Sequence, residues 1–325
     1  MNARLLCCIL IRSALLALLV PCLVIAQPDT ARFLFRRGLM GTQFTLTLYA
    51  PDSLTAQRAS AAVNARMDSL NQTMSDYTDG SEINRLSETS GRGQRVRISP
   101  DLFNALQKAQ TIARLSNGRF DPTIGPLSLL WRRAVRRGEF PTAKQRRRAR
   151  RAVGYRLMRL DSVTRSVQLA RPGMRLDVGG IGQGFAIDEA ATVLRGLGIR
   201  SFLIDLGGDV LAGDGNWSVS LDSTTVISLH NAAITTSGDT YRHLDYRGRR
   251  YSHVMNPRSG LGLHHFVRAT VLAPDGWRAD ALTKVFSVAG MRRSRRLLRR
   301  FPDVKVWLSE NKKGRLRQWQ SAFFE

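Results

Sequence analysis

The order in which two hydrophobic periodicities follow one another constrains the fold of this chain more than any other feature. Apolar residues recur at helical spacing over Ser53–Met74, and a serine followed by proline opens a second helical segment, Ser99–Ser116. Beyond Tyr155 the pattern is alternating and β-branched, with helical interruptions near Gly184–Leu197 and Asp280–Ala289. Helices followed by many strands, with few regular βαβ alternations, predict an α+β fold. We expect a single large domain with a mixed or antiparallel β core and flanking helices.

Several segments have the composition and the bounding turn residues of strands. They span residues 42–50, 155–161, 166–170, 175–179, 201–207, 217–222, 225–237, 241–254 and 269–274.

The first 26 residues have the pattern of a secretory signal. A short basic start, MNAR, precedes an apolar run, and Val24-Ile25-Ala26 places small residues before a cleavage point at Gln27. We therefore expect a signal peptide over residues 1–26 and one domain over residues 27–325. That domain would lie in the periplasm or at the outer face of the cytoplasmic membrane. A retained membrane anchor is the alternative, which the charge of Arg12 inside the apolar run disfavours.

All cysteines of the chain lie inside this first segment, at Cys7, Cys8 and Cys22. The expected mature chain therefore contains no thiol, which excludes disulfide bonds, cysteine nucleophiles and cysteine-ligated zinc. A chain without free thiols also suits an oxidising compartment.

The formal net charge of +25 is concentrated in two arginine-rich runs, Trp131–Arg151 and Met291–Arg300. Such runs are typical either of polyanion binding or of solvated helix faces. We favour solvated faces and expect no nucleic-acid partner, because neither run interleaves the aromatic residues that single-strand binders use. Peripheral attraction to an anionic membrane surface is compatible with this charge.

A glycine-rich stretch lies between two of the expected strands. Gly179, the last residue of RLDVG, is followed by Gly180, Gly182 and Gly184, which lead into an expected helix. This is the outline of a dinucleotide-binding unit. Their spacing does not meet G-x-G-x-x-G, so the Rossmann interpretation is the weaker one. Glycines before a helix can expose backbone amides to a phosphate or a carbonyl to a metal ion. A tight turn without a ligand is the alternative.

Polar residues also occur in two loops rich in glycine and proline. Asp121 lies between apolar runs, while Asp239 and His253 lie further along the chain among turn residues. No nucleophile elbow, zinc-protease motif or P-loop accompanies them. From the residues alone, a phosphate-bearing ligand and a hard metal ion would suit this chain, without defining a reaction.

Taken together, these stretches resemble a known family. The segments MGTQFTL (40–46), MSDYTDGSEINRLSE (74–88), FDPTIGPLSLLW (120–131), LDVGGIGQGFAID (176–188), LIDLGGDV (203–210), TTSGD (235–239), YSHVMNPRSG (251–260) and ADALTKVFSVAG (279–290) occur in the order typical of the FAD:protein FMN transferases, the ApbE family. The resemblance covers nearly the whole expected mature chain. It implies a T-fold-like architecture and a magnesium-dependent reaction. In that reaction FMN moves from FAD to a threonine or serine hydroxyl of a target flavoprotein, and AMP leaves.

The resemblance also implies roles for individual residues. Those that match positions lining the nucleotide are Met40, Tyr77, Arg119, Phe120, Asp121, Asp177, Gln183 and His253. The implied metal site comprises the Gly180 carbonyl and the Asp280 carboxylate, with Thr283 and Lys284 at or next to the position of a third ligand. We take His253, and less strongly Asp239, as candidates to accept the proton of the incoming hydroxyl.

Two positions depart from the family pattern. Gln183 stands where lysine is usual, and Lys284 stands where a threonine would ligate the metal. A charged lysine has hydrogen-bond donors only and cannot ligate magnesium. Three outcomes are open: Thr283 replaces the missing ligand, the Lys284 ammonium replaces part of the metal's charge, or the site binds flavin without transferring it. The further alternatives are a Lys284 that points to solvent, and an enzyme that hydrolyses FAD to FMN and AMP.

Overall fold

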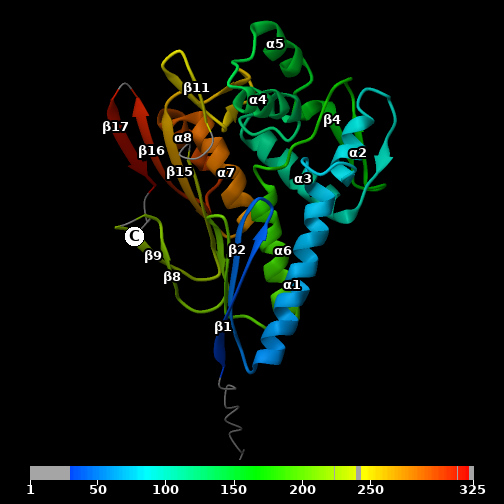
Figure 1. Ribbon diagram of the computed structural model, residues 1–325. Helices are drawn as coiled ribbons and strands as arrows, with labels where there is room; N and C mark the ends of the chain where they lie inside the picture. The colour runs from blue at the N-terminus through cyan, green and yellow to red at the C-terminus, as the bar shows by residue number, and fades with distance from the viewer. Residues whose placement is uncertain (1–29, 223, 239–242, 313, 322–325) are drawn as a thin grey trace, which may run out of the picture.

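An eight-stranded antiparallel sheet forms the centre of the molecule (Figure 1). The computed structural model describes residues 30–222, 224–238, 243–312 and 314–321. The strands of this sheet, in spatial order, are β1 (Ala31–Leu39), β2 (Thr42–Ala50), β6 (Phe202–Leu206), β7 (Asp209–Ala212), β10 (Ala233–Ser237), β15 (Phe266–Ala273), β16 (Lys305–Lys312) and β17 (Arg315–Gln320). Every neighbouring pair in it is antiparallel, which confirms the α+β prediction and excludes a doubly wound parallel sheet.

The remaining strands form small sheets beside the main one. They are β3 (Val96–Arg97), β4 (Met158–Asp161) and β5 (Ser166–Leu169) in one sheet, and the pairs β8 (Trp217–Ser220) with β9 (Val226–Leu229), β11 (His243–Tyr246) with β12 (Arg249–Ser252), and β13 (Met255–Asn256) with β14 (Leu261–Gly262). The pair β8–β9 packs on the face of the main sheet opposite the helices, where Trp217 and Leu229 contact Val210 and Ile234.

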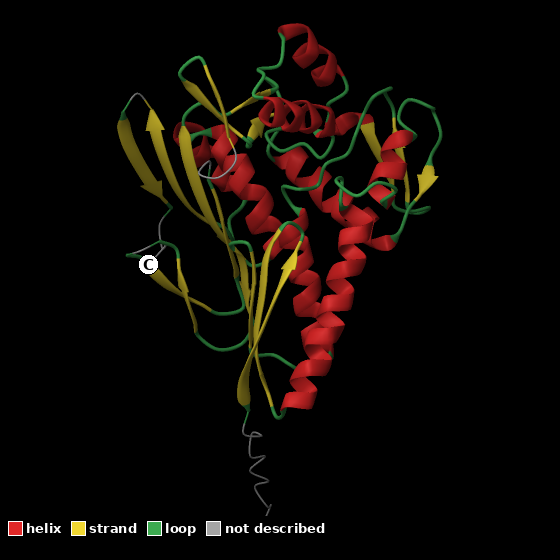
Figure 2. Ribbon diagram, in the orientation of Figure 1, coloured by secondary structure: helices red, strands yellow, loops and turns green. Residues whose placement is uncertain are grey.

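Helices cover the other face of the main sheet (Figure 2). The helices are α1 (Ser53–Met74), α2 (Glu82–Glu88), α3 (Pro100–Leu115), α4 (Gly125–Arg137), α5 (Ala143–Arg151), α6 (Gly182–Gly196), α7 (Gly276–Ala289) and α8 (Met291–Leu297), with the 3₁₀ turns η1 (Tyr155–Leu157) and η2 (Leu298–Arg300). Helices α1, α6, α7 and α8 contact the main sheet, while α4 and α5 lie at the upper end in Figure 1. Helix α6 lies between α1 and α7, and α7 packs on β10 and β15. The helices predicted near the N-terminus are confirmed: the Ser99 hydroxyl accepts the Leu102 amide, as its place before proline indicated.

One predicted strand is absent. RLDVG, residues 175–179, was expected to be β, but it is an irregular segment with a single parallel bridge between Ile124 and Arg175. Its backbone forms a hydrogen bond to the neighbouring loop instead of to a strand: the Asp177 amide donates to the Pro122 carbonyl (2.8 Å). The alternating pattern misled the prediction because Leu176 and Val178 are buried without a sheet partner.

Helix α7 begins four residues before the predicted position. Asp188, on α6, accepts hydrogen bonds from the Gly276 amide (2.7 Å) and the Trp277 amide (2.9 Å). A carboxylate from another helix thus satisfies two of the free donors at the start of α7. Asp280 consequently lies in the second turn of α7 rather than at its start. The sequence around Gly276 does not indicate this cap, because the donor and the acceptor of the hydrogen bond lie 88 residues apart.

Two glycines allow α6 and α7 to cross in direct backbone contact. A Cβ atom at Gly184 would lie 2.2 Å from the Gly276 carbonyl oxygen and 2.7 Å from the Asp280 Cβ. A Cβ atom at Gly276 would lie 2.6 Å from the Gly184 carbonyl oxygen. Neither helix can therefore carry a side chain at this point without moving apart from the other.

We predict that Gly184→Ala lowers the free energy of unfolding by about 1–3 kcal/mol or more, because the added methyl group has no space at the crossing. Gly196→Ala, at the exposed end of the same helix with no neighbouring atom within 4 Å, is the matched control. It should be neutral or stabilising by up to about 1 kcal/mol. Urea denaturation of both variants checks this, and equal stabilities would contradict it.

Candidate functional site

Helix α7 places an acid and a cation one turn apart beneath the glycine-rich segment. Asp280 is fully buried, and its Oδ1 is paired with the ammonium of Lys284. Its Oδ2 accepts the Gly184 amide at 3.2 Å. The interpretation in which Lys284 points to solvent is therefore wrong: its side chain is only 25% exposed and is directed at the buried carboxylate.

A second buried carboxylate, Asp209, lies at the start of β7 on the face of the sheet that α7 covers. Burial raises the pKa of Asp209 to about 8, with a further rise from the charge of Asp280, while Lys284 opposes it. For Lys284 burial acts to lower the pKa, but the charges of Asp280 and Asp209 outweigh it and the pKa is raised. The ammonium thus remains charged between two acids.

The glycine turn before α6 lies directly over this pair. A Cβ atom at Gly180 would lie 3.2 Å from the Phe120 ring and 3.5 Å from Cγ of Lys284. The loop of Phe120 and the turn of Gly180 therefore meet above the alkyl chain of Lys284. This arrangement brings together three residues that the sequence had assigned to one site.

An arginine joins two more of the predicted residues to this region. Arg132, on α4, pairs with Asp76 (2.6 Å) and with Asp177 (3.3 Å), and its guanidinium carbon lies 3.9 Å from the centroid of the Tyr77 ring. Asp177 also accepts the Gly179 amide (2.8 Å), which fixes the start of the glycine turn. Burial and repulsion from Asp177 raise the pKa of Asp76, and Arg132 acts against them.

The next predicted residues, Arg119 and Asp121, have structural partners. The buried carboxylate of Asp121 accepts the amide and hydroxyl of Thr123 and the amide of Tyr155, so its oxygens hold the loop together. Burial nevertheless raises its pKa. Arg119 donates to the Ser116 carbonyl (2.7 Å) at the end of α3. Their predicted contact with a nucleotide is untested by this geometry.

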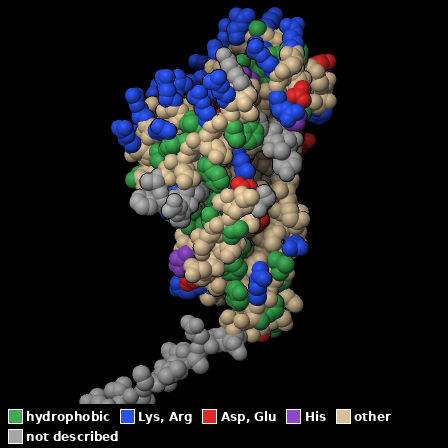
Figure 3. Space-filling view, turned by 90° about the vertical axis from the view of Figure 1, so that its left-hand side faces the viewer, with side chains coloured by type: hydrophobic (Ala, Val, Ile, Leu, Met, Phe, Trp, Pro, Cys, Tyr) green, Lys and Arg blue, Asp and Glu red, His purple; other side chains and the backbone are tan. Residues whose placement is uncertain are grey.

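Four arginines from separate segments gather at the C-terminal end of α3. Burial, together with the charges of Arg258, Arg293 and Arg300, lowers the pKa of Arg119. Arg300 donates to the Leu115 carbonyl (2.6 Å), which suits the negative end of a helix. Lys and Arg side chains are dense over this upper end of the molecule, as Figure 3 shows.

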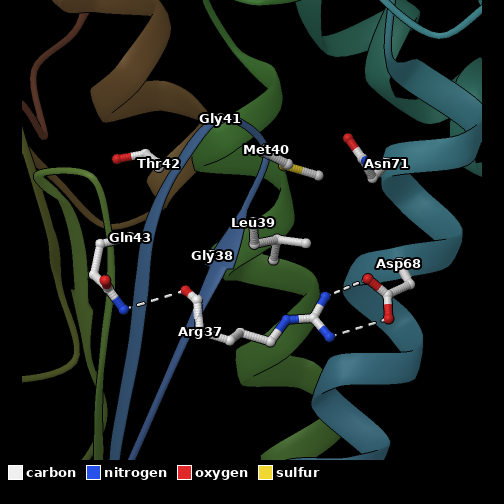
Figure 4. A pocket seen from close by; sticks show the side chains of 9 residues that line it. All are labelled: Arg37, Gly38, Leu39, Met40, Gly41, Thr42, Gln43, Asp68 and Asn71. Carbon is white, nitrogen blue, oxygen red and sulfur yellow. Dashed lines mark hydrogen bonds and ion pairs between the residues drawn. The ribbon is translucent and has the colours of Figure 1, made fainter.

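Met40 lies at the tip of the β1–β2 hairpin, beside an open groove that faces α1 (Figure 4). The groove has a volume of about 840 Å³. Its lining residues are Arg37, Gly38, Leu39, Met40, Gly41, Thr42, Gln43, Asp68 and Asn71. The Thr42 side chain also meets the turn that leads into Asp209, since a Cβ atom at Gly207 would lie 2.5 Å from its Oγ1. The groove therefore adjoins the strand that carries the second carboxylate.

The remaining predicted residues are less closely connected to the site. Gln183 is partly exposed in the first turn of α6, next to Gly184. His253 is exposed just after β12, in a region that packs on α4 through the bond from the Trp131 indole to the Gly260 carbonyl (3.1 Å). Asp239 lies outside the described residues.

The expected magnesium ligands do not fit a metal ion as they stand. The Asp280 carboxylate is engaged by an ammonium and an amide, and the hydroxyl of the buried Thr283 donates to the Asp280 carbonyl (2.7 Å). Lys284 brings donors only. Across the part of the chain that the structure describes, no three acidic, histidine or cysteine residues gather as a metal site. The metal centre expected at Gly180, Asp280, Thr283 and Lys284 stays a prediction. The pairing of Lys284 with Asp280 supports the interpretation in which the ammonium replaces part of the metal's charge.

Sequence reasoning missed three residues of this site, namely Asp76, Arg132 and Asp209. Arg132 belongs to a run interpreted as a solvated helix face, and Asp76 and Asp209 lie inside quoted segments without having been singled out. The available signal for Arg132 was its position directly after Trp131, at the end of an apolar run. The sequence contains no signal for Asp76 and Asp209, because their burial depends on segments distant in sequence.

The fold and this cluster define a class of protein: a single-domain α+β protein with a charged site where a glycine turn meets two crossing helices. The chain belongs to the ApbE family, whose model matches residues 40–308.

Known proteins of this family resemble the chain over most of their length. A FAD:protein FMN transferase of Haemophilus influenzae is 27% identical over 82% of this chain and 84% of its own. One from Klebsiella pneumoniae is 28% identical over 87% and 91%. The apo form of the flavinyl transferase ApbE from Pseudomonas stutzeri has the same fold, with a TM-score of 0.81, 23% identity, and coverage of 90% of this chain and 95% of that one. These relatives are named as transferases, a class of enzymes.

We predict that Arg132→Ala destabilises the protein by about 2–4 kcal/mol, because it leaves the buried Asp76 carboxylate without its cation. Arg133→Ala, the exposed neighbour on the same helix, should stay within about 0.5 kcal/mol of the parent. Chemical denaturation measures both. If both variants lose the same free energy of unfolding, the loss comes from the change in the helix and not from the ion pairs of Arg132, and the prediction is wrong.

Proposed function

We propose that this protein transfers FMN from FAD to a threonine or serine hydroxyl of a target flavoprotein and releases AMP. One observation carries the proposal: residues from four distant motifs are linked around the glycine turn before α6. Phe120 lies against Gly180, Arg132 joins Tyr77 to Asp177, and Asp280 accepts the Gly184 amide. Membership of a family whose named relatives are FAD:protein FMN transferases supports the same reaction.

The proposed reaction is a displacement at phosphorus. The target hydroxyl oxygen attacks the FMN phosphorus, the bond from that phosphorus to the bridging oxygen breaks, and AMP leaves with the electron pair. The hydroxyl proton passes to a base, for which His253 and Asp239 are our candidates. The protein's task in such a reaction is positioning and charge stabilisation rather than covalent attack.

Residues of this chain have separate tasks in this proposal. The exposed Tyr77 ring, supported by Arg132, offers a stacking surface for a ring of the dinucleotide. The groove beside Met40 accommodates another part of FAD. Lys284 lies under the glycine turn, where a cation can face phosphate oxygens. No step is assigned to magnesium, because the expected ligands do not fit it.

We further propose that the reaction takes place outside the cytoplasm, as the signal-like segment over residues 1–26 indicates. None of the helices within the described residues has both the length and the hydropathy needed to span a bilayer. The arginine-rich upper end is our candidate for peripheral contact with an anionic membrane surface.

Transfer is tested by incubating the protein with FAD and a flavoprotein domain that carries an acceptor threonine. We expect a flavin-fluorescent band on a denaturing gel, equimolar AMP, and loss of both when the acceptor threonine of the target is replaced by alanine. A proven flavin transferase serves as the positive control. AMP with free FMN and no labelled band would identify FAD hydrolysis. Bound FAD without AMP would identify a flavin-binding protein that does not catalyse transfer.

Nucleotide binding is tested separately at Tyr77, which is 67% exposed and therefore replaceable without disturbing the core. We expect Tyr77→Ala to weaken FAD binding by about tenfold, in line with the free energy of stacking on an aromatic ring. Tyr77→Phe keeps the ring and should bind like the parent. Quenching of FAD fluorescence measures all three proteins, and an unchanged affinity in the alanine variant would remove Tyr77 from the binding site.

A further inference from the structure

The site contains an excess of buried oxygen atoms around one ammonium. Asp280 and Asp209 are both buried, and the charges of Lys284 and Asp280 both act on Asp209. The two acids come from a helix and from a strand far apart in the sequence. Such a pair is costly to bury without a cation between or beside it.

A third oxygen stands next to this pair. Thr235 on β10 is the registered partner of Asp209 on β7, so their side chains share the face of the sheet that α7 covers. Thr235 is only 1% exposed, and its hydroxyl lies close enough to the Asp209 carboxyl to lower the pKa of that group. A buried hydroxyl beside two buried carboxyl groups adds a third oxygen atom of the kind that a hard cation binds.

Together these atoms have the composition of a hard-cation site. Carboxylate and hydroxyl oxygens are what Mg²⁺ and Ca²⁺ select, and removal of the lysine would leave them without a positive charge. Lys284 is bonded to the Asp280 carboxylate, and the Gly180 turn lies over its alkyl chain. The ammonium thus occupies the place where a divalent ion would have to sit, and a quarter of the Lys284 side chain is exposed to an approaching phosphate.

We propose that the Lys284 ammonium is the resident cation of this site, built into the chain in place of a divalent metal ion. The protein therefore binds a pyrophosphate-bearing dinucleotide without divalent metal. Replacing Lys284 by threonine converts Asp280, Asp209 and Thr235 into a divalent-cation site. The statement on dinucleotide binding rests on the proposed function, because FAD is the dinucleotide that this function requires. The statement on the Lys284→Thr variant does not rest on it.

The metal part is tested with the whole chain from Gln27 onward, using thermal unfolding with millimolar MgCl₂ or with EDTA and luminescence titration with TbCl₃. Lys284→Thr should gain a magnesium-dependent rise in melting temperature of at least about 3 °C and saturable terbium luminescence. The parent should show neither. Asp209→Asn in the Lys284→Thr background should lose most of the gain, because it removes a carboxyl group that can ionise when a metal ion binds.

Two further variants separate charge from shape. Lys284→Arg keeps a cation and should gain no metal response, while Lys284→Met keeps the length of the side chain without charge or an oxygen atom and should respond less than the threonine variant. A folded Lys284→Thr protein that responds to neither magnesium nor terbium would overturn the proposed divalent-cation site, called the latent site below. Circular dichroism establishes folding.

The parent protein, without any substitution, tests the proposal that the dinucleotide binds without a divalent metal ion. FAD affinity, from fluorescence quenching, should change by less than about twofold between EDTA and MgCl₂, since the cation is already present. A loss of about tenfold or more in EDTA would overturn the proposal. Absence of FAD binding under both conditions would refute the proposed function instead, and the metal response of Lys284→Thr would then still decide the latent site.

Discussion

The contact between Gly184 and Gly276 is the constraint on which the rest of this structure depends. Backbone-to-backbone approach of two helices is possible only where both lack a side chain, and here it holds the start of α6 against the start of α7. The same approach lets Asp188 cap α7 and lets the Gly184 amide reach Asp280. The charged site is therefore a consequence of how closely two helices can meet.

Charge compensation then determines what this site can hold. A buried acid is tolerated when a cation and hydrogen bonds satisfy it, and Asp280 has both within its own helix and the next. A lysine supplies one positive charge that cannot dissociate from the chain, whereas a metal ion supplies two and can. If Lys284 is the resident cation, as proposed above, the charge of this site does not depend on the concentration of a free ion.

The sequence predicts the fold class and the motif residues better than it predicts helix ends, loops and buried charges. The α+β class, helices α1 and α3 and strands β2, β6, β10 and β15 of the main sheet follow from periodicity and capping residues. Strands β1, β7, β16 and β17 of the same sheet were not predicted. The positions of Asp280 and Gly180 follow from collinear motifs. The start of α7 and the loop nature of RLDVG could not be predicted, because both depend on partners far away in sequence. Arg132 was misjudged for the same reason: a run of arginines does not reveal which one turns inward to two acids.

The cap that Asp188 makes on α7 also links the two helices in their motions. The first amides of α7 are satisfied by a side chain of α6, so neither helix end can fray without breaking bonds to the other. Regions coupled in this way open as one unit, and their amides exchange with solvent together. We therefore expect the start of α7 and the adjoining part of α6 to open together, because the bonds between them would break in the same step.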